Sequence, residues 1–317
     1  MRYTFICCLI LTSQSTAFGS EKLTLRQDES RIQISQSGKT VLVYNIQSPP
    51  LPDGVDPVYQ RSGFLHPVMS PMGRVVTDTF PRDHLHQHGV FSAWVNTTWN
   101  ERKIDFWNLA GKTGRVLHNR VLSTSCAGTQ AQFSVELIHR AASDPPMDVI
   151  SEIWTITAHS TDGSYHCFDI QSTQSALTNL PLQIHQHHYG GMACRGPSRW
   201  LRSSQSVKEK SAARFLTDAG WDRRSGNHQS AHWVAMFGGV DSDIASITVL
   251  SHRDNFRSPQ KARLHPSKPY FCFAPCVDSG LVIDTDHPYS SAYRFLITDA
   301  APDTAYLTEH WNSWVNE

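Results

Sequence analysis

The strongest constraint on the fold is a series of short runs rich in β-branched and aromatic residues, separated by Gly, Pro, Asn, Asp and Ser. Within runs such as 31–35 and 152–157, apolar and polar residues alternate with a period of two, as a strand with one buried face requires. This spacing is typical of a β-sandwich or barrel and not of alternating strands and helices. The predicted strands cover residues 22–26, 31–35, 40–44, 132–139, 150–158, 165–172, 244–252, 269–274, 281–284 and 292–298.

Only the C-terminal segment predicts a helix. Asp303 can cap its first turn, and the apolar residues Leu307, Trp311, Trp314 and Val315 fall on one helical face. The polar segment 203–226 predicts a surface loop, or a short helix around 211–217. We therefore expect an all-β fold, a large β-sandwich with a short C-terminal helix, formed as a single domain over residues 20–317.

The first residues predict export. Arg2 precedes an apolar run at 5–11 and a small-residue site at 17–19, which together are typical of a signal peptide over residues 1–19. The apolar run is far shorter than the roughly 20 residues that span a bilayer, and no later segment approaches that length. We expect a periplasmic or secreted protein without a transmembrane span, with cysteines that lack a CxxC metal pattern and are buried thiols.

The charge balance argues against nucleic acid as a partner. The chain carries 28 Lys and Arg against 28 Asp and Glu, with no cationic block of the kind that phosphate binding needs. No GxSxG, P-loop, GxGxxG or HExxH motif is present. The sequence therefore does not predict a serine hydrolase, a nucleotide-binding protein or a zincin metalloprotease. The expected partner is a carbohydrate or another small-molecule substrate.

Seventeen histidines are present, and two dense clusters stand out. In the first, residues 83–89, an extended backbone would point His84, His86 and His88 to one face, because side chains alternate along a strand. Same-face neighbours on a strand lie about 7 Å apart, near enough for two of them to hold one metal ion. These three histidines are the candidate ligands of a divalent metal.

The second cluster spans residues 185–191. On an extended backbone His185, His187 and Tyr189 would share a face, with His188 opposite. The following Gly190 and Gly191 permit close approach of a ligand. Arg195, just beyond, suits a carboxylate or an array of hydroxyls.

Weaker candidates lie outside the two clusters. Glu152 shares a strand face with Trp154 and is a possible general base, and Asp105 stands among aromatic residues. Trp94, Trp99 and Trp107 are either core residues or a platform for sugar rings. The candidate catalytic residues are His86, His187, His188, Glu152 and Asp105; the candidate substrate-binding residues are Arg61, His66, Trp107, Tyr189, Arg195 and Asn255.

The segments 61–67 (RSGFLHP), 83–89 (DHLHQHG), 105–107 (DFW), 188–196 (HYGGMACRG), 252–255 (HRDN) and 293–295 (YRF) carry a resemblance. In this order they resemble a family labelled "methane oxygenase PmoA", over most of the mature chain. The label does not imply a subunit of a membrane-embedded oxygenase, since the sequence has no later span. The resemblance implies carbohydrate metabolism and a fold similar to the galactose-mutarotase-like supersandwich, in which a histidine acid and a carboxylate base act on a sugar ring.

Three functional hypotheses follow. The first is an exported carbohydrate-active enzyme in which a histidine and a carboxylate, such as His187 with Glu152 or Asp105, transfer protons on a sugar; hydrolysis, elimination and epimerisation remain open. The second is a metal-dependent enzyme in which His84, His86 and a member of the second cluster bind Zn, Fe or Cu and leave a coordination position open. The third is a non-catalytic carbohydrate-binding protein that uses the three tryptophans.

Overall fold

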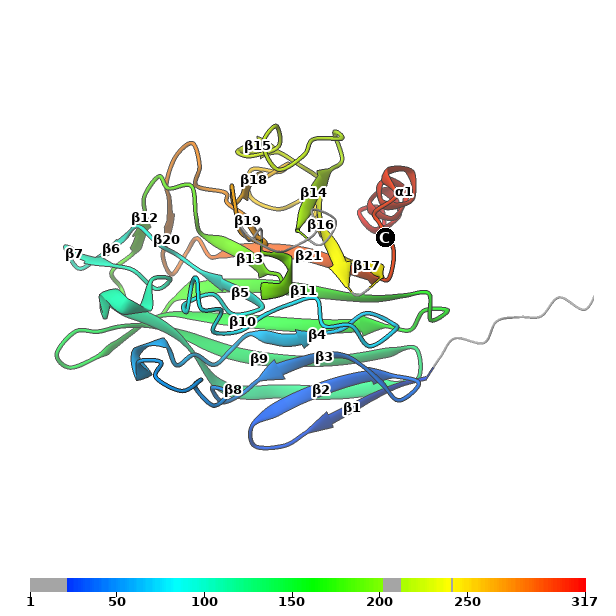
Figure 1. Ribbon diagram of the computed structural model, residues 1–317. Coiled ribbons are helices and arrows are strands. Elements are labelled where there is room, and N and C mark those ends of the chain that lie inside the picture. The colour runs from blue at the N-terminus through cyan, green and yellow to red at the C-terminus, as the bar shows by residue number, and fades with distance from the viewer. Residues whose placement is uncertain (1–21, 202–211, 241) are drawn as a thin grey trace, which may run out of the picture.

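The computed structural model describes residues 22–201, 212–240 and 242–317. The expected signal peptide, residues 1–19, and residues 203–211 of the predicted polar segment 203–226 lie outside these ranges. The described chain is built from antiparallel β-sheets with one short C-terminal helix (Figure 1), which confirms the expected fold class.

Within the described residues, the strands form three sheets. The nine-stranded sheet has the order β1 (Leu23–Gln27), β2 (Arg31–Gln36), β3 (Lys39–Asn45), β4 (Leu65–Val68), β5 (Val90–Ala93), β13 (Gly191–Arg195), β19 (Tyr270–Phe273), β18 (Lys261–Leu264) and β15 (Gln229–Ser230). The eight-stranded sheet has the order β14 (Arg214–Thr217), β16 (Trp233–Val240), β17 (Asp243–Ser251), β21 (Tyr289–Thr298), β11 (Tyr165–Ala176), β10 (Met147–His159), β9 (Gln130–Ala141) and β8 (Gly114–Ala127). The four-stranded sheet has the order β20 (Leu281–Ile283), β12 (Leu182–Ile184), β6 (Thr97–Trp99) and β7 (Arg102–Ile104). Short 3-10 helices cover Pro57–Tyr59 (η1), Leu109–Gly111 (η2) and Ser198–Trp200 (η3).

The two large sheets pack face to face as a sandwich. The ring centroids of Tyr44 on β3 and Phe133 on β9 lie 5.5 Å apart. Further along the interface, Trp94 Nε1 donates a hydrogen bond to Gln174 Oε1 on β11 at 2.7 Å. Aromatic side chains from both sheets fill the space between them, as the alternation of the strands requires.

The C-terminal helix α1 (Thr304–Trp314) forms as expected. The side chain of Asp303 caps it by accepting a hydrogen bond from the backbone N–H of Tyr306 at 3.0 Å. Leu307 and Trp314 are buried in a small apolar cluster that includes Trp233 on β16. The helix therefore docks on the eight-stranded sheet through its apolar stripe (Figure 1).

All predicted strands are present, but the sequence patterns missed other strands of the same sheets. The long strand β8 is the clearest case: most of its side chains are exposed, so it lacks the alternation that marks a half-buried strand, and pairing with β9 holds it in the sheet. The short helix considered around 211–217 is wrong, because 214–217 forms β14 and pairs with β16. In both cases the pairing with a partner strand, and not the local pattern, decides the conformation.

The five cysteines among the described residues are free, and four of them, Cys167, Cys194, Cys272 and Cys276, are buried, as expected for thiols without a structural pairing. Cys126 is the exposed exception. Among the described residues, no helix combines the length and apolar character needed to cross a membrane.

Candidate active site

Strand pairing gathers polar and aromatic side chains on the outer face of the nine-stranded sheet. Phe91 on β5 pairs with Ala193 on β13, and two residues further Arg195 pairs with Tyr270 on β19. Paired residues and residues two apart share a face. The residues between them point inward, since the ring of Phe271 contacts Phe215 of the opposite sheet at 6.1 Å.

A turn formed by residues 81–88 covers this face. Backbone hydrogen bonds from His84 to Pro81 and from Gln87 to His84, both 2.9 Å, make two successive turns. The extended backbone predicted for the first histidine cluster is therefore wrong. The rings of His84 and His86 still meet edge to face at 5.5 Å, but His88 turns away into the protein.

Arg195 anchors the turn to the sheet. Its guanidinium donates to both carboxylate oxygens of Asp83, at 2.8 and 3.1 Å, and to Gln87 Oε1 at 2.8 Å. Lys268 Nζ lies 3.2 Å from the same carboxylate. Burial alone would raise the pKa of Asp83, but hydrogen bonds from His84 and Arg195 hold it well below its ordinary value. Arg195, predicted to bind substrate, instead positions the histidine turn through Asp83, which the sequence patterns did not single out.

The turn ends at Gly89, where the backbone conformation favours glycine and the surrounding atoms leave no room for a Cβ atom. Its φ is +48°, and a Cβ atom there would lie 1.9 Å from the carbonyl oxygen of Leu65. We expect Gly89→Ala to lower the free energy of unfolding by about 2 kcal/mol or more, measured by urea denaturation. Gly73→Ala is the control, because Gly73 has a φ of +78° and open space around it. Equal losses in the two variants would show that the close approach to Leu65 has no cost.

Arg61 lies beneath the same face with unused hydrogen-bond donors. Its side chain is 1% exposed, and its guanidinium packs over the ring of Phe91 at 4.8 Å. Nη2 donates to the carbonyl oxygen of Ser92 at 2.9 Å, whereas Nε and Nη1 have no partner among the described residues. Burial lowers the pKa of Arg61 to about 10, so it remains a cation at neutral pH. Buried donors without partners mark a place where a ligand or water completes the hydrogen bonding.

His86 and His265, which lie near these arginines, are uncharged at neutral pH. Burial, followed by the charges of His84, Arg61 and Arg195, lowers the pKa of His86 to about 4. His265, whose ring lies 5.6 Å from that of His84, also has a pKa lowered to about 4, mainly by burial. Neutral imidazoles beside fixed cations form an electropositive site that contains proton acceptors.

The second histidine cluster is also not a strand, because β12 ends at Ile184. The rings of His187 and His188 stack at 4.6 Å with an interplanar angle of 17°, so they do not point to opposite faces as predicted. His185 turns away, and its Nε2 lies 2.8 Å from Thr98 Oγ1. Burial and the neighbouring His187 lower the pKa of His188 to about 4.

A continuous row of rings joins the two clusters. Tyr189 lies 4.5 Å from His188 and 6.0 Å from Tyr270, measured between ring centroids. Tyr270 lies 6.3 Å from His265, which contacts His84 of the first cluster. The two clusters therefore border one face. The linking residues Tyr270 and His265 were missed, because each stands alone in sequence and only strand pairing brings them here.

Aromatic and cationic neighbours complete this border. Trp107 packs against Phe91 at 4.7 Å and against Tyr189 at 6.1 Å, as part of the site's wall. Arg263 on β18, also missed in the sequence, donates to the hydroxyl of Tyr189 at 3.1 Å. His66 lies on the adjacent strand β4 with Nδ1 2.9 Å from Thr77 Oγ1.

The expected carboxylate partners of His187 are held elsewhere. Glu152 is 0% exposed between the two sheets, where His139 Nε2 lies 2.6 Å from its Oε2. Trp154 Nε1 and Ser172 Oγ each donate to its Oε1 at 2.7 Å. The alternation placed Glu152 and Trp154 on one face correctly, but that face is the core.

Asp105 and Asn255 have structural hydrogen bonds. Asp105 Oδ1 accepts from the backbone N–H groups of Trp107 and Asn108, both at 2.8 Å, which closes a turn. Asn255 bridges to the backbone of Ala292 on β21 through both its amide oxygen and its amide nitrogen, at 2.7 and 2.9 Å. Neither side chain faces the histidine clusters with a free polar group.

The tryptophans are core residues and not a sugar platform. Trp94, Trp99 and Trp107 are 0%, 5% and 2% exposed. A ring that stacks on a sugar must present a face to solvent. The non-catalytic hypothesis, which needed these three rings, loses its structural basis.

A divalent metal held by His84, His86 and His88 does not fit this geometry. Nδ1 of His88 lies 3.0 Å from Thr79 Oγ1, and its ring packs between Phe64 and Phe80 at 5.1 and 4.8 Å. Over the ranges that the structure describes, no group of three or more His, Cys, Asp or Glu side chains is arranged to hold a metal ion. The turn, in place of the expected strand, separates the three donors.

The fold and this face define an all-β sandwich protein with a histidine- and arginine-rich site outside its larger sheet. The sequence model of the family described as "Family of unknown function (DUF6807)" matches residues 31–312, and the chain belongs to this family. No curated protein sequence matches the chain. The expected relation to the PmoA-labelled family gains no support from these matches.

Two solved structures align with most of this chain at low sequence identity. A heparan sulfate lyase HepC mutant from Pedobacter heparinus aligns with 89% of this chain and 37% of its own, at 9% sequence identity and a TM-score of 0.41. The α-N-acetylgalactosaminidase NagBb from Bifidobacterium bifidum, in complex with GalNAc, aligns with 94% of this chain and 38% of its own, at 15% identity and a TM-score of 0.34. This chain thus spans less than two fifths of either solved chain. Similarity at this level carries no information on activity.

Proposed function

We propose that this protein is an exported carbohydrate-active enzyme that moves a proton at a sugar carbon, with His86 as the base and Arg61 as the group that stabilises the developing negative charge. One observation carries the proposal: a buried arginine with unpartnered N–H groups lies under a turn whose histidine stays neutral at pH 7. A general base must be unprotonated at the working pH, and fixed donors stabilise an anion without reorganising.

The geometry supports elimination or epimerisation over glycoside hydrolysis. Hydrolysis generally uses two carboxyl groups flanking the glycosidic bond. Here Glu152 and Asp105 have other partners, and Asp83 is bound by Arg195 and Lys268. Abstraction of a proton next to a sugar carboxylate or carbonyl needs one base and a cation to hold the enolate-like oxygen.

In the proposed elimination, the C–H bond next to the acid or carbonyl group breaks and its proton passes to the imidazole of His86. The electron pair forms a carbon–carbon double bond, and the bond to the glycosidic oxygen breaks. The leaving oxygen takes up a proton from water, and the imidazolium of His86 returns its proton to the solvent. In epimerisation, the same carbanion-like intermediate is instead protonated on its other face.

The test is incubation of purified protein in D2O with a panel of uronic-acid oligosaccharides and keto-sugars. Deuterium incorporation at the carbon next to the carboxylate or carbonyl, or ultraviolet absorbance of a new conjugated double bond, is expected for one of them. Release of free reducing sugar without either signal would show hydrolysis and contradict the proposal. Absence of all three signals across the panel would also contradict it.

The pH dependence provides a second expected result. Because burial lowers the pKa of His86 to about 4, its unprotonated form persists well below pH 6.5, the ordinary range of histidine. Activity is lost as pH falls through the pKa of the base, so the acidic limb of kcat/KM is expected near pH 4. A limb near pH 6.5 would point to an exposed histidine as the base.

A further inference from the structure

Two adjoining pockets, lined in part by residues 99–115, form a basic groove. One pocket, of about 90 Å³, is lined by Trp99, Arg102 and Thr113, among others. The neighbouring pocket, of about 420 Å³, is lined by η1 and by Arg115. Lys112 lines both pockets, so the two form one continuous surface.

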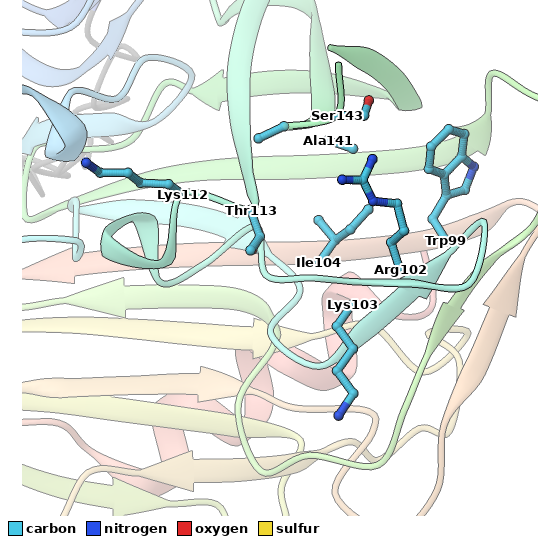
Figure 2. Close-up of a pocket in the computed structure, with 9 residues that line it drawn as sticks. Trp99, Arg102, Lys103, Ile104, Lys112, Thr113, Ala141 and Ser143 are labelled. Atoms are coloured by element: carbon cyan, nitrogen blue, oxygen red, sulfur yellow. The ribbon is translucent and has the colours of Figure 1, made fainter. Parts of the chain in front are cut away.

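Three cations in this groove have no ionic partner. Arg102, Lys112 and Arg115 form neither an ion pair nor a side-chain hydrogen bond with any other residue in the described ranges. Figure 2 shows the guanidinium of Arg102 directed toward Ala141 and Ser143, into the pocket, while Lys103 on the same strand points away. The linings of the two pockets contain one carboxylate, Asp56, against these cations, so the groove carries a local excess of positive charge.

One of these cations also faces a like charge. Arg115 on β8 pairs directly across the sheet with Arg140 on β9, an arrangement that is destabilising on its own. The guanidinium of Arg140 is bound by Asp148 through two hydrogen bonds, whereas Arg115 has no such partner. An anion in the groove would supply the missing counter-charge.

We propose that this groove binds the carboxylates of an acidic polysaccharide, a chain of uronate-bearing sugar units that continues from the proposed site. One segment links the two places: Ile104 lines the groove, while Trp107, three residues later, packs on Phe91 and Tyr189 of the site. A polymer with one carboxylate per unit can present anions to Arg61 and to the groove at once. The proposal rests on the proposed function only in stating that one polymer reaches both the proposed site and the groove. Binding in the groove itself needs no turnover.

The probes are polygalacturonate, alginate and heparin, titrated by calorimetry into the wild-type protein at low salt. At least one is expected to bind, with an affinity that falls as salt is added, whereas fully methyl-esterified polygalacturonate, which lacks the charge, is not. The triple variant Arg102→Gln/Lys112→Gln/Arg115→Gln is expected to bind about tenfold or more weakly, with a shallower dependence on salt.

The matched control is Lys22→Gln/Arg26→Gln/Lys39→Gln, which removes the same charge from exposed positions at β1 and β3. Equal losses in the two triple variants, equal binding of single-stranded DNA, or no binding of any probe would each overturn the groove as a polysaccharide site. Binding is measured again in His86→Ala. Lost turnover with retained binding in that variant separates the groove from the proposed chemistry. A groove triple variant that binds normally while His86→Ala is inactive would overturn the groove and leave the proposed chemistry standing.

Discussion

Replacing His139 with leucine is expected to lower the free energy of unfolding by about 3–5 kcal/mol, because it leaves a charge in the core without its partner. His139 and Glu152 are both 0% exposed and lie 2.6 Å apart between the two sheets. Although burial alone would raise it, the hydrogen bond and charge of His139 hold the pKa of Glu152 down at about 2. Removing His139 takes this stabilisation away, so the variant either buries an unpaired carboxylate or folds only after that carboxylate is protonated, and both are costly.

The comparison with a Glu152→Gln background isolates this effect. Glutamine keeps an acceptor for the indole N–H of Trp154 but carries no charge. In that background His139→Leu should cost only about 1–2 kcal/mol, the scale of a lost neutral hydrogen bond. Urea denaturation followed by circular dichroism measures both. Equal costs in the two backgrounds would show that Glu152 is not the reason for the loss.

The same pair predicts how acid affects stability. The folded-state pKa of Glu152, about 2, lies below the ordinary value of 4.5. Its contribution is therefore fully present above about pH 4.5 and is lost as the pH falls toward 2. Glu152→Gln should flatten this part of the stability curve.

A strand can be predicted from the sequence when one of its faces is buried and the other is exposed to solvent. β2 and β10 alternate between buried and exposed residues, and both were predicted from that pattern. β8 does not alternate, because its second half lies exposed at the edge of the sheet beyond β9. Its presence follows from a partner strand, which no local pattern encodes.

The site illustrates a different limit. The residue types in the histidine clusters correctly drew attention to one face, but the HxH spacing was interpreted as a strand when turn signals were present. Pro81 and Gly89 flank the first cluster, and both favour turns. With Asp83 between them, the segment folds back so that Arg195 can bind the carboxylate. His265 could not have been found this way, since its neighbours come from distant strands.

Alternation of apolar and polar residues also does not show which face of a sheet packs against the core. It placed Glu152 and Trp154 on one face, and they do share a hydrogen bond. Only the packing of the second sheet makes that face buried, which turns a candidate base into part of a core network. Hydrophobic pattern gives the period of a strand; sheet packing decides which polar residues reach solvent.

His86→Ala is expected to reduce kcat/KM by about 10²–10⁴ on the sugar found in the deuterium and absorbance assays, the range attributed to one general base. The fold should be unaffected, since the residue is partly exposed and its ring meets that of His84 edge to face. Thermal unfolding of the variant should therefore match that of the wild type. Added imidazole should restore part of the activity, because it can enter the vacated space and accept the proton.

The control for this prediction is His185→Ala. This histidine belongs to the second cluster in sequence, but its ring turns to Thr98 and away from the site. It should keep full activity and show no response to imidazole.

Arg61→Lys tests the second residue of the proposed mechanism. A lysine keeps the charge but cannot present the guanidinium donors, so kcat should fall more than KM rises if Arg61 stabilises the developing anion. Unchanged turnover in a folded His86→Ala protein would remove His86 as the base and leave His188, at the other end of the ring row, as the next residue to replace.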